Sequence, residues 1–252
     1  MRLTTPLTAL FAGIFLSAVA LAHGVAETTT KQNTIEGVLG VPDPVKVVLA
    51  ASAVIAFFVV LSLVFKKSLR EKHKKIMFVL IAVSIAAATL YLVGVTLALN
   101  SISATGGPVH WHADIEVWAC GERYHFAHSQ GWDNKVGTPL MHLHNDDRLH
   151  IEGVVVRMQD VELGEFFRAV GGSFTPESIT MPTTVGVKKW FNGDACNGKM
   201  AFLYMFVSNR LETKMSEHVI SPYSSVPPGD RIKIVFSEKP MDKINPNIGV
   251  EP

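Results

Sequence analysis

Hydrophobic residues form two long, uninterrupted runs in the first hundred residues of the chain and only short ones after that. Val47 to Phe65 is a run of 19 residues without a charge, and Ile76 to Leu99 is a run of 24. A helix rises about 1.5 Å per residue, so each run can cross a hydrocarbon core of about 30 Å. Neither run has the polar face of a helix on a soluble domain. The pattern predicts transmembrane helices at 47–65 and 76–99.

A shorter apolar segment occupies the first 22 residues. It carries one basic residue, Arg2, and ends in Ala-Leu-Ala, which is typical of a secretory signal with a small-residue cleavage site. The alternative is an uncleaved anchor helix that uses the apolar run from Leu7 to Ala22. We therefore expect a signal peptide or N-terminal anchor at 1–22, followed by a short extracytoplasmic segment at 23–46.

The segment between the two long runs sets their orientation. It reads KKSLREKHKK at 66–75 and holds six Lys or Arg residues. Short loops this basic stay on the cytoplasmic side of a membrane, so the first helix runs inward and the second outward. Everything after a short flexible tether at 100–108 is then exported. We predict a cell-membrane protein whose residues 109–252 form an extracytoplasmic domain, in the periplasm or outside the cell.

The part predicted to be exported is dominated by strand-like patterns. One helix is expected at Val161–Val170, with Asp160 as its N-cap and Gly171 and Gly172 at its end. Strands with one helix indicate a mainly-β α+β domain, either a ubiquitin-like roll or a small barrel. The expected strands alternate polar and apolar residues, or are rich in Val, Ile and aromatic residues, at 109–118, 149–157, 200–207 and 231–236.

Charge limits the partners of the protein. The formal net charge is +1, but residues 100–252 hold fourteen Lys or Arg against eighteen Asp or Glu. Nucleic-acid-binding surfaces are basic, so this acidic part is not expected to bind nucleic acid. The expected partners are the membrane, a metal ion, and another membrane or exported protein.

Both cysteines of the chain, Cys120 and Cys196, lie in the part predicted to be exported. A cysteine pair in an oxidising compartment most often forms a disulfide. The alternative is that one or both are thiolate ligands of a metal ion, although neither lies in a Cys-x-x-Cys motif. We expect the bridge, which closes a loop of about 75 residues and stabilises the domain by roughly 4 kcal/mol.

Histidine is concentrated between His110 and Gly153, where seven of the ten histidines of the chain lie. Side chains two residues apart on a strand point to the same face. Two His-x-His pairs and one His-x-Glu pair have this spacing. They are His110 with His112, His142 with His144, and His150 with Glu152.

Imidazole is a ligand for zinc, copper, iron and nickel, and a neighbouring carboxylate can bind the metal or orient a ring. Directly opposed residues on paired strands have Cβ atoms about 4.5–5.5 Å apart, so their histidines can share one ion. Structural or pH-responsive histidines are the alternative. We predict a copper or zinc site with a ligand core of His110, His112, His142 and His144, with His150 next in line, and with Glu116, Asp146 or Glu152 completing or orienting the shell.

The motifs HWHADIEV, HLHNDDRLHIEG, VELGEFFRAVGGSF and PPGDRIKIVF resemble a group of prokaryotic membrane-tethered exported domains of uncharacterised function. The shared pattern is His-x-His on an alternating strand, a second His-x-His, and a His-Ile-Glu strand, over about His110 to Phe236. Here Asn145 precedes Asp146, where the group has Asp directly after the His pair. The resemblance implies a site at these histidines and supplies no activity.

A shorter resemblance links His110, His112, Glu116 and Gly121 to the first metal motif of the cupins. It implies a β-barrel that holds Mn, Fe, Ni or Zn. The second half of the cupin motif is not visible at the corresponding place in this sequence.

Three kinds of function are compatible with these features. The leading hypothesis is a membrane-anchored extracytoplasmic module that binds copper or zinc for metal handling or sensing. The second is a metal-dependent enzyme with a cupin-like or open site, in which Glu116 or Glu152 is the general base. The third is an interaction or pH-responsive domain without a metal. The first leads because the sequence has neither a Gly-x-Ser-x-Gly motif nor a His-Glu-x-x-His helix.

Overall fold

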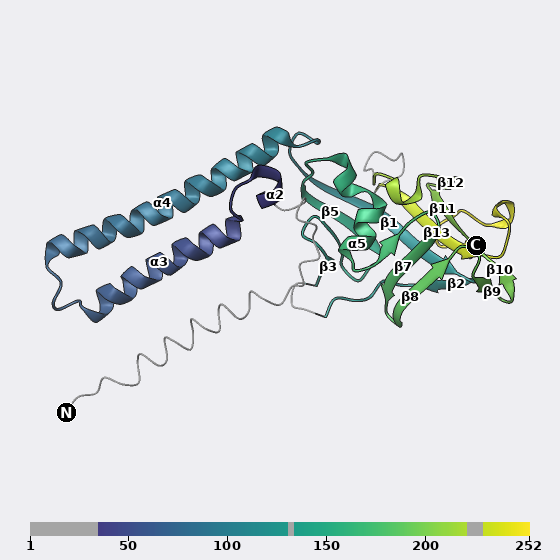
Figure 1. Cartoon of the computed structure of the whole chain (residues 1–252), viewed down its shortest axis with the longest axis horizontal. Helices are drawn as coiled ribbons and strands as arrows, with labels where there is room; N and C mark the ends of the chain where they lie inside the picture. The colour runs from purple at the N-terminus through teal and green to yellow at the C-terminus, as the bar shows by residue number, and fades with distance from the viewer. Residues whose placement is uncertain (1–34, 131–133, 221–228) are drawn as a thin grey trace, which may run out of the picture.

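The computed structural model describes residues 35–130, 134–220 and 229–252. The predicted signal peptide or anchor at 1–22 lies outside these residues. A hairpin of two long helices leads into a β-rich domain (Figure 1). The α-helices of the described part are α2 (Ile35–Leu39), α3 (Pro44–Val64), α4 (Glu71–Ile102) and α5 (Leu163–Ala169).

The hairpin consists of the two apolar runs, and its helices begin earlier than the predicted spans. α3 begins at Pro44, because the Asp43 side chain accepts a hydrogen bond from the Val45 N–H at 2.7 Å and proline suits the first helical position. α4 begins at Glu71, inside the basic segment, and continues to Ile102. Half of the predicted loop at 66–75 is therefore helical.

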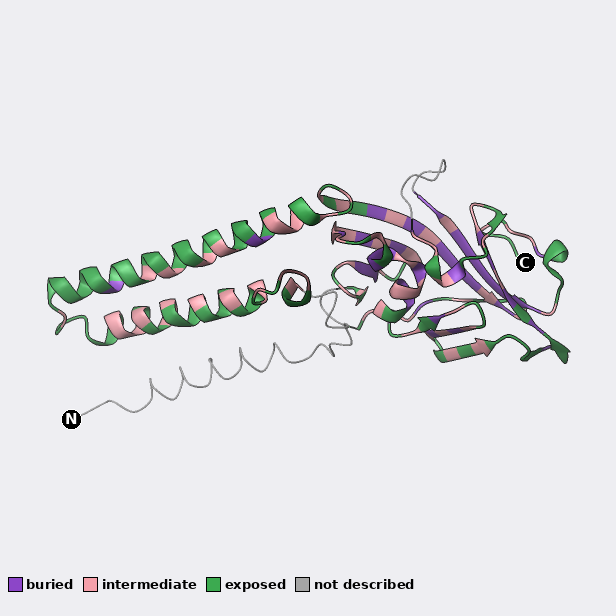
Figure 2. Ribbon diagram, turned by 45° about the horizontal axis from the view of Figure 1, so that its top comes forward, coloured by how far each residue is buried: buried purple, intermediate pink, exposed green. Residues whose placement is uncertain are grey.

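The surfaces of α3 and α4 are apolar and exposed. Both helices are long and apolar enough to cross a membrane. No residue of α3 is buried, and in α4 only Met77 and Val95 are, whereas most of the buried segments in Figure 2 belong to the β-rich domain. Phe78 and Leu90 are each 72% exposed. Apolar surface of this extent marks a contact with lipid or with another protein.

The β-rich domain is built on a mixed eight-stranded sheet. Its order is β12-β11-β13-β1-β5-β4-β3, with β2 also paired to β1, and the described strands leave it open at β12 and β3. The central strand β1 is parallel to β13 and antiparallel to β5. The strands are β1 (Pro108–Ala119), β2 (Glu122–Tyr124), β3 (Val136–Gly137), β4 (Met141–Leu143), β5 (Arg148–Val154), β11 (Phe202–Val207), β12 (Arg210–Leu211) and β13 (Arg231–Ser237).

One face of this sheet forms the core. Alternate residues of β1 and β5, such as Ile115 and Ile151, are buried there against Phe166 and Phe167 of α5. A smaller sheet of order β6-β7-β8 also contributes to the core, through Ile179. The remaining strands are β6 (Ser173–Phe174), β7 (Ser178–Thr183), β8 (Gly186–Phe191), β9 (Ala195–Cys196) and β10 (Lys199–Met200).

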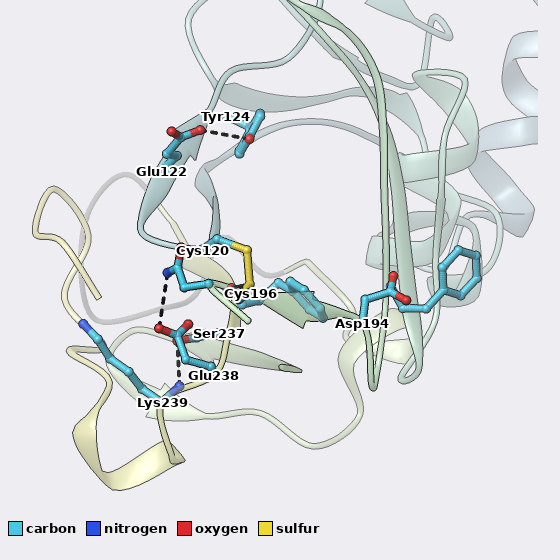
Figure 3. The surroundings of a disulfide bond; sticks show 11 residues. Cys120, Glu122, Tyr124, Asp194, Cys196, Ser237, Glu238 and Lys239 are labelled. Carbon is cyan, nitrogen blue, oxygen red and sulfur yellow. Dashed lines mark hydrogen bonds between the residues drawn. A yellow bond between two sulfur atoms is a disulfide. The ribbon is translucent and has the colours of Figure 1, made fainter. Parts of the chain in front are cut away.

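A disulfide joins Cys120, which directly follows β1, to Cys196 on β9 (Figure 3). The two Cα atoms are 5.3 Å apart, and 76 positions separate the residues in the sequence. The Cys120 N–H also donates a hydrogen bond to the Phe236 carbonyl of β13 at 3.0 Å. The predicted pairing of the cysteines is confirmed, and bridged sulfurs are not thiolate ligands.

The helix predicted at Val161–Val170 is shorter than expected. Glu162 is the N-cap residue of α5, while Asp160 belongs to a preceding 3-10 helix, Met158–Val161. The Asp160 carboxylate accepts hydrogen bonds from the backbone and side chain of Arg157. Because Asp160 lies in the preceding 3-10 helix, it does not cap α5.

The connection between α4 and β1 is fixed to the domain. The Ser103 hydroxyl and the Ala104 N–H both donate hydrogen bonds to the Val155 carbonyl, each at 2.9 Å. The Thr105 hydroxyl donates to the Gly107 carbonyl at 2.7 Å. Within the predicted tether at 100–108, residues 100–102 belong to α4 and Pro108 to β1, and 103–107 form a hydrogen-bonded connection between them.

Candidate metal centre

Three neighbouring strands carry the clustered histidines on the face of the main sheet opposite the core. Directly opposed residues on paired strands share a face. His112 of β1 lies opposite His150 of β5, and His150 lies opposite His142 of β4. This row of imidazoles crosses the three strands, and the next row places His110 opposite Glu152. The two predicted His-x-His pairs therefore lie on the same side of the domain.

Two overlapping groups of side chains have the spacing of metal ligands. In each group, one nitrogen or oxygen atom per residue lies within 4.8 Å of the corresponding atoms of the other members. His150 belongs to both groups, and the ligand core predicted from the sequence is divided between them. The inner group is His142, His144, His150 and Glu152, and the outer group is His110, His112 and His150.

The Nε2 atoms lie close together within each His-x-His pair. They are 3.2 Å apart between His142 and His144, and 3.0 Å apart between His110 and His112. Two nitrogens bound to one zinc ion at about 2.0–2.1 Å, with an angle of about 90–110°, are separated by about 2.9–3.4 Å. Each pair therefore has the separation of two ligands on one ion.

A backbone contact fixes the ring of His144. Its Nδ1 atom lies 2.9 Å from the carbonyl oxygen of Asn134. A carbonyl oxygen only accepts hydrogen bonds, so Nδ1 carries the proton and Nε2 keeps its lone pair. Metal-binding histidines commonly have such a contact on the nitrogen that does not bind the metal.

The carboxylate of Glu152 lies between the two His-x-His pairs. Its Oε1 atom is 3.4 Å from Nε2 of His110, and its Oε2 atom is 3.8 Å from Nε2 of His142. Burial raises the pKa of Glu152, but the hydrogen bond and charge of Lys135 and the nearby histidines outweigh it, so this pKa lies below its usual value. Glu152 is therefore an anion at neutral pH and can bind a cation.

The surroundings favour the neutral form of three rings. Burial is the largest cause that lowers the pKa of His112, His142 and His150. The positive charge of Arg148 lowers the pKa of His112 further, and that of Lys135 lowers the pKa of His142. Only neutral imidazole binds a metal ion, so few protons have to be displaced from these rings at neutral pH.

The turn between β4 and β5 brings His144 and His150 together, with ring centroids 4.7 Å apart. Asn145 and Asp147 in this turn have positive φ angles of 65° and 51°. Asn and Asp adopt this left-handed conformation more readily than other non-glycine residues. The sequence His-Asn-Asp-Asp thus closes the β4–β5 hairpin beside the cluster.

A glycine on β3 lets the chain pass close to His142. Gly137 lies opposite His142 and has a φ of 127°. A Cβ atom at this position would lie 2.4 Å from the Met141 carbonyl oxygen, so only glycine fits without a backbone shift. This close packing accompanies the complete burial of His142.

One predicted acidic residue, Glu116, lies away from the cluster. It is four residues further along β1 than His112, about 13 Å at 3.3 Å per residue. Its Oε1 atom is 3.0 Å from Nη1 of Arg123, and its Oε2 atom accepts a hydrogen bond from Nε1 of Trp118 at 3.1 Å. The structure therefore does not bring Glu116 to the histidines, because it lies too far along β1, and its carboxylate pairs with Arg123 instead.

Asp146 lies at the border of the cluster. Its Oδ2 atom is 3.7 Å from Nε2 of His150, and its Oδ1 atom accepts a hydrogen bond from the Arg148 N–H at 3.1 Å. Asp146 belongs to neither group of ligand atoms. A role in orienting His150 stays a prediction.

Two histidines outside the cluster contact carboxylates. His125 contacts Asp147 through Nδ1. His218 lies between Glu212 and Asp230, with nitrogen–oxygen distances of 3.3 and 3.0 Å. Neither histidine was expected to be a ligand, and neither belongs to the two groups.

The residues of 134–137 that border the cluster could hardly be predicted from the sequence. Asn134 contributes a backbone carbonyl, which any residue can supply, and Lys135 approaches Glu152 from a loop without periodicity. Gly137 offered the one available signal, since an isolated glycine indicates a close backbone approach.

Comparisons of this chain with protein-family models, with curated proteins and with solved structures find no match. The resemblances to membrane-tethered exported domains and to cupins therefore remain expectations from short motifs.

Proposed function

We propose that the protein is a membrane-anchored extracytoplasmic module that binds copper or zinc, for metal handling or sensing. One observation carries the proposal: the inner group, His142, His144, His150 and Glu152, places three imidazoles and a carboxylate within 4.8 Å of one another. Three nitrogen ligands with one carboxylate suit zinc or copper better than calcium or magnesium, which prefer oxygen ligands.

The proposed location rests on the ends of the two apolar helices. The basic residues of 66–75 keep the connection between α3 and α4 on the cytoplasmic side, so the β-rich domain lies on the other side. The disulfide between Cys120 and Cys196 fits an oxidising compartment. For this domain we propose the ubiquitin-like roll rather than the small barrel, because the described sheet is open and its central pair, β1 and β13, is parallel.

A metal-dependent enzyme is the second candidate function. The geometry leaves one candidate for its general base. Glu116 is bound to Arg123 and Trp118, which leaves Glu152 of the two acids considered. The Glu152 side chain is 32% exposed and lies beside the histidines. A water bound to the metal would be within its reach only if the ion kept an open coordination position.

Replacing His112 and His144 together by alanine is expected to abolish stoichiometric metal binding. Each His-x-His pair then keeps only one of its two closely spaced Nε2 atoms, so the affinity of each pair for Zn²⁺ or Cu²⁺ falls by more than about 100-fold. The full chain, purified in detergent without a polyhistidine tag, is titrated with each ion, and bound metal is measured by elemental analysis.

The matched control replaces His73 and His128 by alanine, since both are exposed and belong to neither ligand group. This variant should bind metal like the parent. Near-ultraviolet circular dichroism verifies that both variants are folded. A parent chain that binds no Zn²⁺ or Cu²⁺, or a His112/His144 variant that binds like the parent, contradicts the proposed function.

The proposed topology predicts where fused reporters are active. Alkaline phosphatase fused after Pro252 should be active, because this enzyme needs export to form its disulfides. Green fluorescent protein at the same position should be dark. The reciprocal result is expected when the same reporters follow Lys67 in a truncated chain. A fluorescent Pro252 fusion with inactive phosphatase would place the histidine cluster in the cytoplasm.

A further inference from the structure

We propose that the histidine cluster binds two metal ions, with the second ion on His110 and His112 and with His150 shared between the two. This inference rests on the proposed function, because the first ion is the one assigned to the inner group. Beyond the proposed function, it specifies how many ions the cluster binds and which residue connects them.

The outer group supports a second ion by its own geometry. Its two Nε2 atoms, of His110 and His112, are 3.0 Å apart, as cis ligands of one ion would be. His110 is exposed and His112 is partly exposed, so this position is open to solvent. In contrast, His142 of the inner group is fully buried. The cluster thus offers one enclosed and one accessible binding position.

His150 has the position and the free atoms of a bridging ligand. It lies on the middle strand, and its ring centroid is 4.6 Å from that of His112 and 4.7 Å from that of His144, nearly perpendicular to both. Both of its ring nitrogens are buried and have no hydrogen-bond partner among the described residues. Burying a polar atom without a partner is unfavourable, and an ion on each nitrogen removes this penalty.

Glu152 provides negative charge between the two positions. Its Oε1 atom faces His110 of the outer group, and its Oε2 atom faces His142 of the inner group, at 3.4 and 3.8 Å. Two divalent cations repel each other strongly at short range. A carboxylate between them reduces this repulsion, and the ammonium of Lys135, now on Oε2 at 3.3 Å, gives way to the inner ion.

Binding of two ions by His150 has a defined proton balance. Neutral His150 carries one N–H and one lone pair, and the lone pair binds the first ion without loss of a proton. When the second ion binds, the N–H bond breaks, a nitrogen–metal bond forms in its place, and the proton passes to the solvent. The second ion therefore releases one proton per chain at a pH at which the other rings are already neutral.

Copper(II) titration of the full chain at pH 8, in detergent and without a polyhistidine tag, tests the inference. We expect two Cu²⁺ ions per chain. One unpaired spin should appear in the electron paramagnetic resonance spectrum after the first equivalent. After the second equivalent the signal should decrease, because a shared imidazole couples the two spins. A pH indicator in weak buffer should register one proton released with the second ion.

Replacing His110 and His112 by alanine leaves the inner group intact. This variant should bind one Cu²⁺ ion with one full spin, should release no proton, and should retain the near-ultraviolet circular dichroism of the parent. The variant with alanine at His73 and His128 should behave like the parent in every measurement.

The outcomes separate the two proposals. One ion per parent chain overturns the second position and leaves the proposed function standing. Two ions with two uncoupled spins and no proton release overturn the sharing of His150. No bound Cu²⁺ or Zn²⁺ overturns both proposals.

Discussion

Replacing Cys120 and Cys196 by alanine is expected to lower the unfolding free energy of the β-rich domain by about 4 kcal/mol, because the unfolded chain regains the freedom of a large loop. The chain between the cysteines, which are 76 positions apart, includes α5, the small sheet, and His142, His144, His150 and Glu152 of the cluster. For a domain of this size, the loss corresponds to a decrease in melting temperature on the order of 10 °C. Thermal unfolding of the full chain in detergent, followed by tryptophan fluorescence, measures it.

Reduction provides the control for this prediction. A thiol reductant should lower the melting temperature of the parent chain and leave that of the alanine variant unchanged. The parent should show no titratable thiol in denaturant before reduction. Two free thiols in the unreduced, air-exposed parent would refute the bridge and restore the interpretation of the cysteines as metal ligands.

Replacing Lys233 by methionine is expected to destabilise the same domain by about 3 kcal/mol, because the charge-assisted hydrogen bonds of a buried ammonium group are lost. Lys233 is fully buried on β13, where burial lowers its pKa. Its ammonium group donates hydrogen bonds to the carbonyls of Asn245, Asn247 and Val250, at 2.9, 2.9 and 2.6 Å. Methionine keeps the length of the side chain but supplies no donor, so the C-terminal segment loses these three hydrogen bonds.

Lys239 offers a matched control in the same part of the chain. It is exposed, and its ammonium group donates one hydrogen bond to a carbonyl of this segment, at Pro252. Its replacement by methionine should change the unfolding free energy by less than about 1 kcal/mol. Thermal unfolding measures both variants. Equal losses of unfolding free energy at Lys233 and Lys239 would show that the buried lysine and its three hydrogen bonds contribute no extra stability.

The sequence predicted the composition of the cluster better than its boundaries. The two-residue period identified which side chains of β1 share a face, but a face extends along the whole strand. Glu116 was included for that reason, although it lies too far along β1 to reach His112. The spatial relation of the strands depends on register, and no local pattern reveals that His150 lies between His112 and His142.

The fold shows a similar division between local and long-range information. The lengths of the apolar runs indicated α3 and α4, and hydrophobic alternation indicated β1 and β13. The hairpin of β7 and β8 escaped prediction, since Pro182 lies inside β7 and proline argues against a strand. Asp160 had the chemistry of an N-cap, but its carboxylate accepts hydrogen bonds from Arg157 within the preceding 3-10 helix.

The rigid connection after α4 has a consequence for the exchange of metal. Ser103 and Ala104 are bonded to Val155, and His110 follows only eight residues after the end of α4 at Ile102. In a protein anchored as proposed, these hydrogen bonds would hold the accessible ligands close to the bilayer surface. For a protein anchored in this way, we expect a donor or acceptor of the ion to approach along the membrane surface, so that a neighbour embedded in the same bilayer is favoured over a bulky soluble carrier.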